Sequence, residues 1–228
     1  MKILVTGSEG NIGSKLVPHL IRAGHGVIGL DKKSLDYGHY HLDAVIHLAA
    51  DHEVNASWDS VLKNNIIGTA NVYAQALLHG VKKIILASSN HVTGCYEGTP
   101  PRLHLEDKPR IITIDDVVRP DGNYGTSKVF GEAVARQFYE NYGMTSYCLR
   151  IGSFLEDDNP IKSDKRFLKT WISHRDFFSL IDRCLETRMN EPRFGVYYAV
   201  SNNKSKFWDT SNAERELDWV PQDDASIL

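Results

Sequence analysis

Two residues four positions apart, Tyr124 and Lys128, could carry out proton transfer. Positions i and i+4 lie on one face of a helix. A lysine there can stabilise a phenolate, which lowers the pKa of the tyrosine and allows proton transfer near neutral pH. The Tyr-x-x-x-Lys pattern is common by itself, so its context matters. Here it follows a predicted strand that ends in Ala87-Ser88-Ser89-Asn90 and brings hydroxyl groups to the sheet edge where parallel sheets bind ligands.

A glycine-rich segment near the amino terminus could hold a phosphate-bearing ligand. Gly7, Gly10 and Gly13 are spaced G-x-x-G-x-x-G between a strand pattern at Lys2–Thr6 and a helical pattern. Gly7 permits a tight turn, Gly10 lets a pyrophosphate approach the backbone, and Gly13 lets the helix pack against the sheet. Unpaired N–H groups at the helix start would then face the phosphates. This context favours a dinucleotide site over a glycine turn that binds no nucleotide.

The residue that ends the next predicted strand bears on which dinucleotide binds. Asp31 would accept hydrogen bonds from the adenosine ribose and repel a 2′-phosphate, which favours NAD as cofactor. Lys32 and Lys33 follow directly and could attract a 2′-phosphate, so NADP stays the second choice.

Apolar patterning predicts the elements that position these residues. Strands alternate with longer helical segments, which indicates βαβ units and one Rossmann-like α/β domain over residues 1–228, with a doubly wound parallel sheet. The predicted strands are Lys2–Thr6, Val27–Asp31, Ala44–Ala50, Lys82–Ala87, Thr145–Ile151 and Gly195–Val200. The predicted helices are Asn11–Ala23, Ser57–His79 with Gly80 as its cap, Tyr124–Tyr142, Ser173–Thr187 and Asn212–Leu217. Thr99–Asp121 reads as a long loop with a short extended piece at Arg110–Ile114.

Composition excludes several classes of protein. The 228 residues are 42% apolar and 24% charged, with a net charge of −3, which excludes a disordered chain and argues against nucleic acid as a partner. No apolar run has the length of a membrane helix, and Met1–Gly7 does not resemble a signal peptide, so no membrane partner is expected. Three widely spaced cysteines suggest reduced thiols and a cytoplasmic location. The histidines match no zinc spacing, so no metal site is expected.

From Met1 to about Pro221 the chain resembles the extended short-chain dehydrogenase/reductase superfamily, also described as the NAD-dependent epimerase/dehydratase family. Three stretches resemble uronate dehydrogenases and related sugar dehydrogenases in particular. They are Ala87-Ser88-Ser89-Asn90-His91; Arg119-Pro120-Asp121-Gly122-Asn123-Tyr124-Gly125-Thr126-Ser127-Lys128 with Phe130-Gly131-Glu132; and Arg150-Ile151-Gly152-Ser153, followed by Arg166 and Thr170-Trp171-Ile172-Ser173-His174.

The resemblance implies a role for each matching position. Ser89 would hydrogen-bond the reacting sugar oxygen, Tyr124 would act as general base, and Lys128 would hold the nicotinamide ribose and tune Tyr124. Arg166 would bind a uronate carboxylate in bidentate fashion, or it belongs to a solvated charged loop. The implied cofactor-binding residues are Gly7, Glu9, Gly10, Asn11, Ile12, Gly13, Asp31, Leu48, Ala49, Ala50, Asn65, Tyr124, Lys128 and Ile151, and the implied substrate-binding residues are Asn90, His91, Ser153 and Arg166.

The sequence departs from the family pattern after Asp31. Lys32–Asp43 is too short for the helix, third strand and second helix that the family places there, so this strand should be missing or a stub. The strand containing Asp31 could then lie at the sheet edge. Leu42 and Asp43 could replace the acidic–apolar pair that normally walls the adenine site.

These features predict an NAD-dependent oxidoreductase that transfers hydride from a sugar or sugar-acid (uronate-like) hydroxyl, with residues 152–228 forming a small substrate cap. Alternatives are a nucleotide-sugar epimerase or dehydratase, and a degenerate, non-catalytic dinucleotide-binding or sensor protein. The resemblance also implies a homodimer through the two long helices.

Overall fold

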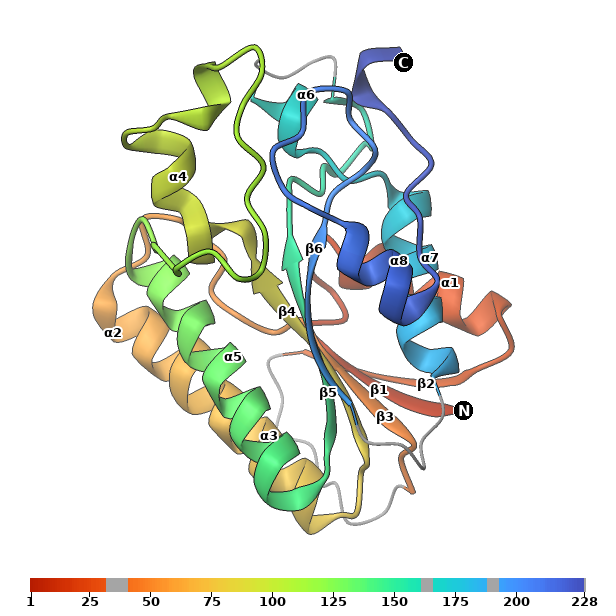
Figure 1. The fold of residues 1–228 in the computed structure, drawn as a ribbon. Coiled ribbons are helices and arrows are strands. Elements are labelled where there is room, and N and C mark those ends of the chain that lie inside the picture. The colour runs from red at the N-terminus through yellow and green to blue at the C-terminus, as the bar shows by residue number, and fades with distance from the viewer. Residues whose placement is uncertain (32–40, 161–165, 188–192, 228) are drawn as a thin grey trace.

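A parallel sheet forms the centre of the molecule (Figure 1). The computed structural model describes residues 1–31, 41–160, 166–187 and 193–227, and their six strands follow the order β2-β1-β3-β4-β5-β6. The strands are β1 (Lys2–Thr6), β2 (Gly26–Leu30), β3 (Ala44–His47), β4 (Lys83–Ser89), β5 (Thr145–Ile151) and β6 (Phe194–Ala199). Each lies where the sequence predicts a strand, and every pairing is parallel. The Rossmann-like α/β fold class is confirmed.

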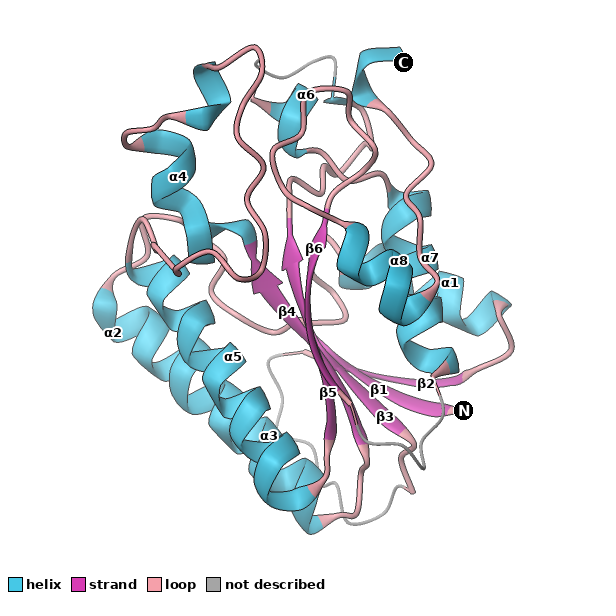
Figure 2. Ribbon diagram, in the orientation of Figure 1, coloured by secondary structure: helices cyan, strands magenta, loops and turns pink. Residues whose placement is uncertain are grey.

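Three helices cover one face of this sheet (Figures 1 and 2). Leu16 and Leu20 of the first helix and Phe177 and Ile181 of the second are fully buried in one apolar cluster with sheet residues such as Ile46. Burial of an apolar stripe stabilises each helix more than its intrinsic propensity does. The three helices are α1 (Gly13–Arg22), α7 (His174–Glu186) and α8 (Ser211–Leu217).

Two long helical segments cover the opposite face. Tyr73 and Ala76 from one and Val134 and Ala135 from the other pack with Val45 in a second apolar cluster. The sheet is therefore buried on both faces, which explains why its strands read as nearly continuous apolar runs. The first segment comprises α2 (Trp58–Val61), a π-helical turn (Leu62–Ile67) and α3 (Gly68–Leu78), and the second is α5 (Asn123–Tyr142).

The segment predicted as one helix over Ser57–His79 is helical throughout, but its middle is wound as a π-turn. Ser57 caps its start, because its side chain accepts a hydrogen bond from the Ser60 backbone. The predicted end is also confirmed, since His79 is the capping residue and Gly80 follows with φ of +72°.

Segments above the carboxyl ends of the strands form a small cap (Figure 1). The predicted loop Thr99–Asp121 packs here, and the piece expected to be extended contributes Ile112, which bridges to Trp208. Phe207, Trp208 and Tyr198 join Ile112 in a third apolar cluster. The sequence did not predict the short helix α4 (Gly94–Gly98) or the 3-10 turns at Asn90–Thr93, Leu103–Leu105 and Ala225–Ile227, and a further short helix is α6 (Phe167–Thr170).

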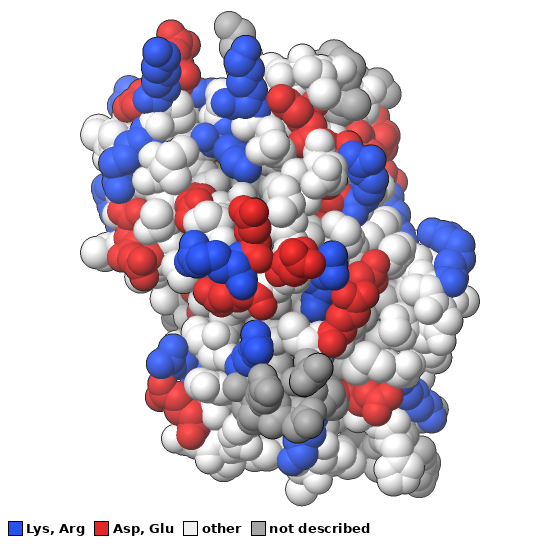
Figure 3. Space-filling view, turned by 45° about the vertical axis from the view of Figure 1, so that its right-hand side comes forward, with Lys and Arg blue, Asp and Glu red and all other residues white. Residues whose placement is uncertain are grey.

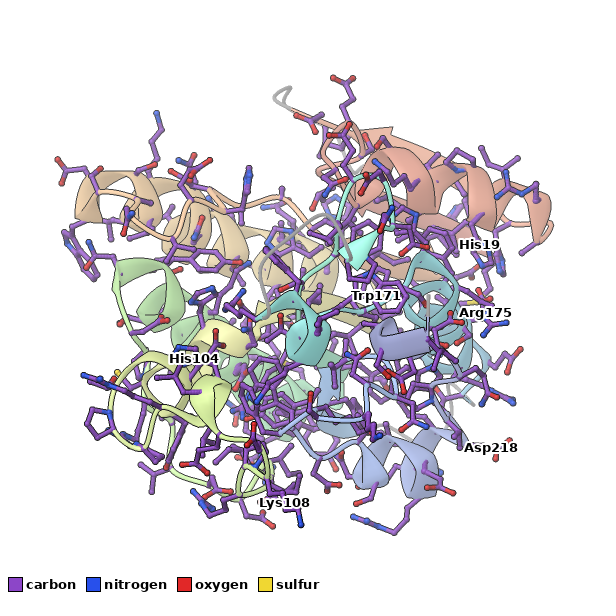
Figure 4. The ribbon with its side chains drawn as sticks, turned by 90° about the horizontal axis from the view of Figure 1, so that it is seen from above. His19, His104, Lys108, Trp171, Arg175 and Asp218 are labelled. Carbon is purple, nitrogen blue, oxygen red and sulfur yellow. The ribbon has the colours of Figure 1, made fainter. Side chains whose placement is uncertain are left out.

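Seen from above, Trp171 lies between the cap and the helices of the main sheet (Figure 4). His104 and Lys108 mark the cap on one side of it, and His19 of α1 and Arg175 of α7 mark the helices on the other. Trp171 is almost fully buried, and its carbonyl accepts hydrogen bonds from the backbone of Ser201 and the side chain of Asn203. It thus joins the segment before α7 to the segment after β6.

The shortened segment after Asp31 lies largely outside the described residues, since the structure describes nothing between 32 and 40. Among the described strands, β2 pairs with β1 alone and forms one edge of the sheet, as predicted. Leu42 and Asp43 do not wall the adenine site. Leu42 is buried in the core, and Asp43 accepts a hydrogen bond of 2.6 Å from the backbone of Lys2, at the start of β1 and away from the carboxyl edge.

The surface carries both signs of charge. On the face shown in Figure 3, lysine and arginine side chains are interspersed with aspartate and glutamate. No helix in the described part of the chain is long and apolar enough to cross a membrane.

A buried lysine fastens α7 to the sheet. Lys83, at the start of β4, is fully buried, and its Nζ donates to the backbone oxygens of Cys184, Leu185 and Thr187 at 2.9, 2.8 and 2.9 Å. The last carbonyls of a helix lack intrahelical partners, and a cation there also interacts favourably with the helix dipole. Burial lowers the pKa of Lys83 to about 8.

We expect Lys83→Met to lower the free energy of unfolding by about 2–4 kcal/mol, because the carbonyls of Leu185 and Thr187 lose the donor that Lys83 supplies. Urea denaturation followed by circular dichroism measures this. The neighbouring Lys82 is exposed, so Lys82→Met is the matched control and should change stability by less than about 0.5 kcal/mol. Equal stability of the two variants would contradict the role given to Lys83.

Candidate active site

A cleft of about 930 Å³ opens at the carboxyl ends of the strands and extends from the glycine turn to the cap. Parallel strands bring their following loops to this one edge, which is why residues far apart in sequence meet there. Of the predicted site residues, the cleft is lined by Gly7, Glu9, Gly10, Asn11, Ile12, Gly13, Asp31, Leu48, Ala49, Ala50, Ser89, Asn90, His91, Tyr124, Lys128, Ile151, Ser153 and Arg166.

The glycine turn is tightly packed and presents backbone donors. Gly7 has φ of +70°, and a Cβ on it would lie 2.8 Å from the backbone nitrogen of Ala49. A Cβ on Gly13 would lie 2.2 Å from the carbonyl oxygen of Gly7. Within the described residues, the backbone N–H groups of Asn11 and Ile12 have no hydrogen-bond acceptor. Such donors at a helix start fit a phosphate group.

Asp31 lies beside this turn, at the end of β2. Its Oδ2 accepts a hydrogen bond of 3.2 Å from the backbone of Glu9, and both residues line the cleft. This contact holds the carboxylate close to the glycine turn, where a ribose hydroxyl could donate to it. Lys32 and Lys33, which bear on NADP, lie outside the described residues.

Asn65 is the one predicted site residue that does not line the cleft. It lies buried in the π-helical turn, and π-turns are frequent at functional sites. Its side chain accepts from the backbone nitrogen of Asp51 at 2.7 Å and donates to Ser127 Oγ at 2.9 Å. Ser127 Oγ donates in turn to the carbonyl of Tyr124 at 2.7 Å. Asn65 therefore positions the segment after β3, which carries Asp51, and the start of α5.

Tyr124, Ser89 and Lys128 are brought together as predicted. Lys128 lies on α5 with its Nζ 5.6 Å from the centre of the Tyr124 ring, and it donates to the carbonyl of Ala87 at 2.8 Å. Burial alone lowers the pKa of Lys128 to about 8. The expected lowering of the tyrosine pKa is wrong for this structure. Burial raises the pKa of Tyr124 and the charge on Asp51 adds to this, while a hydrogen bond with Ser89 acts against it.

His47, which the sequence places in an apolar strand, lies beneath this group. Its two ring nitrogens are 2.7 Å from Thr6 Oγ1 and 3.2 Å from Thr69 Oγ1. Burial first, and then the charge on Lys128, lowers the pKa of His47 to about 3. The imidazole is therefore neutral at physiological pH.

The residues predicted to bind substrate come from several segments of the chain. His91 Nδ1 lies 2.7 Å from Asp121 Oδ2, and the rings of His91 and Tyr124 form a T-shaped contact with 5.7 Å between their centres. Arg166 Nη1 donates to Ser153 Oγ at 3.3 Å, and its Nε and Nη2 are paired with Glu97. The charged segment before Arg166 lies outside the described residues, but Arg166 itself lines the cleft.

A buried ion pair supports the site from below. Arg150 Nε and Nη2 on β5 each donate to Glu132 on α5 at 2.9 Å. Ser88 Oγ, next to Ser89, donates to the same carboxylate at 2.6 Å, and Arg150 Nη1 donates to the Tyr198 hydroxyl at 3.0 Å. The pair therefore fixes α5 against three strands.

Sequence reasoning missed the residues that hold the predicted ones. Asp51, Glu97 and Asp121 have no motif of their own, although each is an acidic residue near the end of a strand or turn. Asp51 directly follows Ala50, and Asp121 stands inside the quoted Arg119–Lys128 stretch, so both had a positional signal. Glu97 had none. Among the described residues, no cluster of histidine, cysteine, aspartate or glutamate could hold a metal ion.

The fold and the glycine turn together define a dinucleotide-binding α/β protein. Residues 3–175 match the model of the NAD dependent epimerase/dehydratase family, so the chain belongs to that family. It is 35% identical over 185 residues to the NAD-dependent glucose-6-phosphate dehydrogenase of Haloferax volcanii, covering 80% of this chain and 69% of that protein. It is 31% identical over 256 residues to the L-arabinose 1-dehydrogenase (NAD(P)(+)) of the same organism, covering 100% and 98%.

The fold also matches solved structures. A mutant of uronate dehydrogenase from Agrobacterium tumefaciens, complexed with NAD, superimposes with a TM-score of 0.82 at 30% identity. The match covers 99% of this chain and 86% of that one.

Two glycine substitutions compare a crowded position in the turn, Gly13, with one that has room for a Cβ, Gly10. We expect Gly13→Ala to destabilise the protein by about 1–3 kcal/mol, because the new Cβ meets backbone atoms that cannot move aside. A Cβ on Gly10 would have Gly7 O as its nearest neighbour at 3.4 Å, so Gly10→Ala should change stability by less than about 0.5 kcal/mol. Thermal unfolding measures both, and a Gly13→Ala variant as stable as Gly10→Ala would show that the turn is looser than described.

Proposed function

We propose that the chain is an NAD-dependent oxidoreductase that transfers a hydride from a sugar or sugar-acid hydroxyl to the nicotinamide, with Tyr124 as general base. One observation carries this proposal. A single cleft joins the glycine turn to Tyr124, Ser89 and Lys128. The activities named for the three similar proteins above, which are sugar or uronate dehydrogenases, support the same substrate class.

The residues of the cleft fit NAD. The unpaired N–H groups of Asn11 and Ile12 would bind the pyrophosphate, and Asp31 would bind the adenosine ribose. Leu48, Ala49, Ala50 and Ile151 would line the path between the two ends. Bound NAD supplies the acceptor for the hydride, at C4 of its nicotinamide ring.

The proton that leaves the sugar hydroxyl would pass to Tyr124. In this mechanism the phenolate oxygen of Tyr124 accepts the proton while the C–H bond breaks and its electron pair leaves with the hydride, so a carbonyl forms. Ser89 hydrogen-bonds the reacting oxygen and holds it close to Tyr124. Lys128 Nζ lies 5.6 Å from the centre of the ring, so its cation would oppose the rise in the pKa of Tyr124 that burial causes.

Substrate would bind at the cap end of the cleft. Asn90, His91, Ser153 and Arg166 line this end. We infer that the described parts of residues 152–228 outside α7, β6 and α8 cover the substrate together with Gly94–Asp121, because Ile112 and Trp208 join the two parts. Asp121 holds His91 through the Nδ1 contact, which leaves Nε2 to meet a sugar hydroxyl.

The test begins with NAD and NADP binding by calorimetry, followed by NADH formation with aldoses, uronates and sugar phosphates. We expect micromolar NAD binding and turnover with at least one sugar.

Tyr124→Phe should lose turnover by about 10²–10⁴-fold and keep NAD binding. Tyr142 is exposed on the same helix, so the control variant Tyr142→Phe should lose neither turnover nor NAD binding. Turnover should rise with pH as Tyr124 deprotonates, because only the phenolate can accept the proton.

Other results would redirect the assignment. Inversion of a nucleotide sugar without net NADH would indicate an epimerase. A folded protein that binds neither cofactor would indicate a non-catalytic role.

We also infer a homodimer in which α3 and α5 of two chains pack together. Exposed apolar side chains lie on both helices and on the π-turn that precedes α3, among them Leu78, Phe130 and Ile67, and exposed apolar surface can mark an interaction site. Phe130→Glu and Leu78→Glu should convert a dimer to a monomer in light scattering. Val117→Glu, on an exposed loop of the cap, should leave the dimer intact, and a monomeric wild-type protein would refute the assignment.

The cytoplasm is the location that we infer for the chain. Cys95, Cys148 and Cys184 are free thiols, and the last two are buried, which suits a reducing compartment. Recovery of the protein from an extracytoplasmic fraction would contradict this.

A further inference from the structure

Arg166 forms an ion pair with Glu97, a residue that belongs to no recognised motif. Its Nε contacts Glu97 Oε1, and its Nη2 donates to Glu97 Oε2 at 3.2 Å. This is the side-on, bidentate arrangement in which a guanidinium binds a carboxylate most strongly. Nη1 donates to Ser153 Oγ at 3.3 Å. The edge of Arg166 best suited to a carboxylate is therefore occupied by a side chain of the same protein.

The pair is placed so that it governs the cap end of the cleft. Glu97 lies on α4 with only 7% of its surface exposed, and Asn90 Nδ2 lies 3.4 Å from its Oε2. Arg166 and Asn90 line the cleft, so Glu97 contacts two lining residues from behind. A buried carboxylate needs its cation, because an uncompensated buried charge is costly.

We propose that Glu97 determines substrate specificity by neutralising Arg166, so that the site accepts a neutral aldose in preference to a sugar acid. The inference rests on the proposed function and narrows its substrate class. A uronate carboxylate would have to displace Glu97 from Arg166 and would meet a second negative charge at the same place. The hydroxyl groups of a neutral sugar carry no such charge, and they can donate to or accept from the groups already there.

Substrate pairs that differ at one carbon test this directly. Glucose and glucuronate, and galactose and galacturonate, differ only in a hydroxymethyl against a carboxylate group. We expect wild-type protein to have the higher kcat/KM for the neutral member of the pair that it oxidises. Glu97→Gln removes the negative charge that pairs with Arg166 and repels a uronate, so the uronate-to-aldose ratio of kcat/KM should rise about 10- to 100-fold.

Controls separate this effect from a general loss of structure. Asp115→Asn removes an exposed acidic charge from the same loop region and should leave the ratio unchanged. The double variant Glu97→Gln, Arg166→Met should lose the gain, because the gain depends on the guanidinium. Calorimetric binding of glucuronate, tighter to Glu97→Gln than to the wild type by a similar factor, gives a readout that needs no turnover.

Two outcomes would overturn the proposal. The first is a wild-type protein that prefers the uronate of either pair. The second is a folded Glu97→Gln variant whose ratio and glucuronate affinity match the wild type. Failure of every sugar to yield NADH would instead count against the proposed function, and the glucuronate titration would still decide whether Glu97 masks Arg166.

Discussion

The buried ion pair between Arg150 and Glu132 is the interaction on which the geometry of the site depends. It joins β5 to the helix that carries Tyr124 and Lys128. Ser88 binds the same carboxylate, so the strand that ends in Ser89 is held to the same point. Removing one partner of such a pair leaves the other charge buried and costs about 3–5 kcal/mol. The ion pair and the Ser88 hydrogen bond therefore help to set the position of Ser89 relative to Tyr124.

Much of the fold could be predicted because burial on both faces gives the parallel strands a clear apolar signature. Strand β5, predicted at Thr145–Ile151, has those ends in the structure. The site residues follow from the same constraint, since the loops after parallel strands meet at one edge. Ser89, Ile151 and Ala49 come from three different strand ends and still line one cleft. The apolar pattern of the strands, together with the rule that loops after parallel strands meet at one edge, was enough to place these residues together.

The rest could not be predicted because it depends on contacts between distant residues. The π-turn carries Asn65, whose side chain donates to Ser127 Oγ on α5. The residues around Asn65 in the sequence do not predict that contact. The sequence predicts a lowered pKa for Tyr124, whereas burial raises it, for a related reason. The Tyr-x-x-x-Lys pattern suggests a nearby cation, whereas the effect of burial on the phenol arises from the whole surrounding fold.

The two ends of the cleft consequently differ in what their sequence reveals. The end proposed for the cofactor phosphates is made of backbone, and its shape demands glycine at Gly7 and Gly13 because a Cβ would collide with the chain. That requirement leaves a readable motif. The end proposed for the sugar is made of side chains, and its charge depends on the pairing of Arg166 with Glu97. A motif can therefore indicate the cofactor of a protein of this family, whereas the specificity that we propose depends on a pair, Arg166 and Glu97, that only the folded chain brings together.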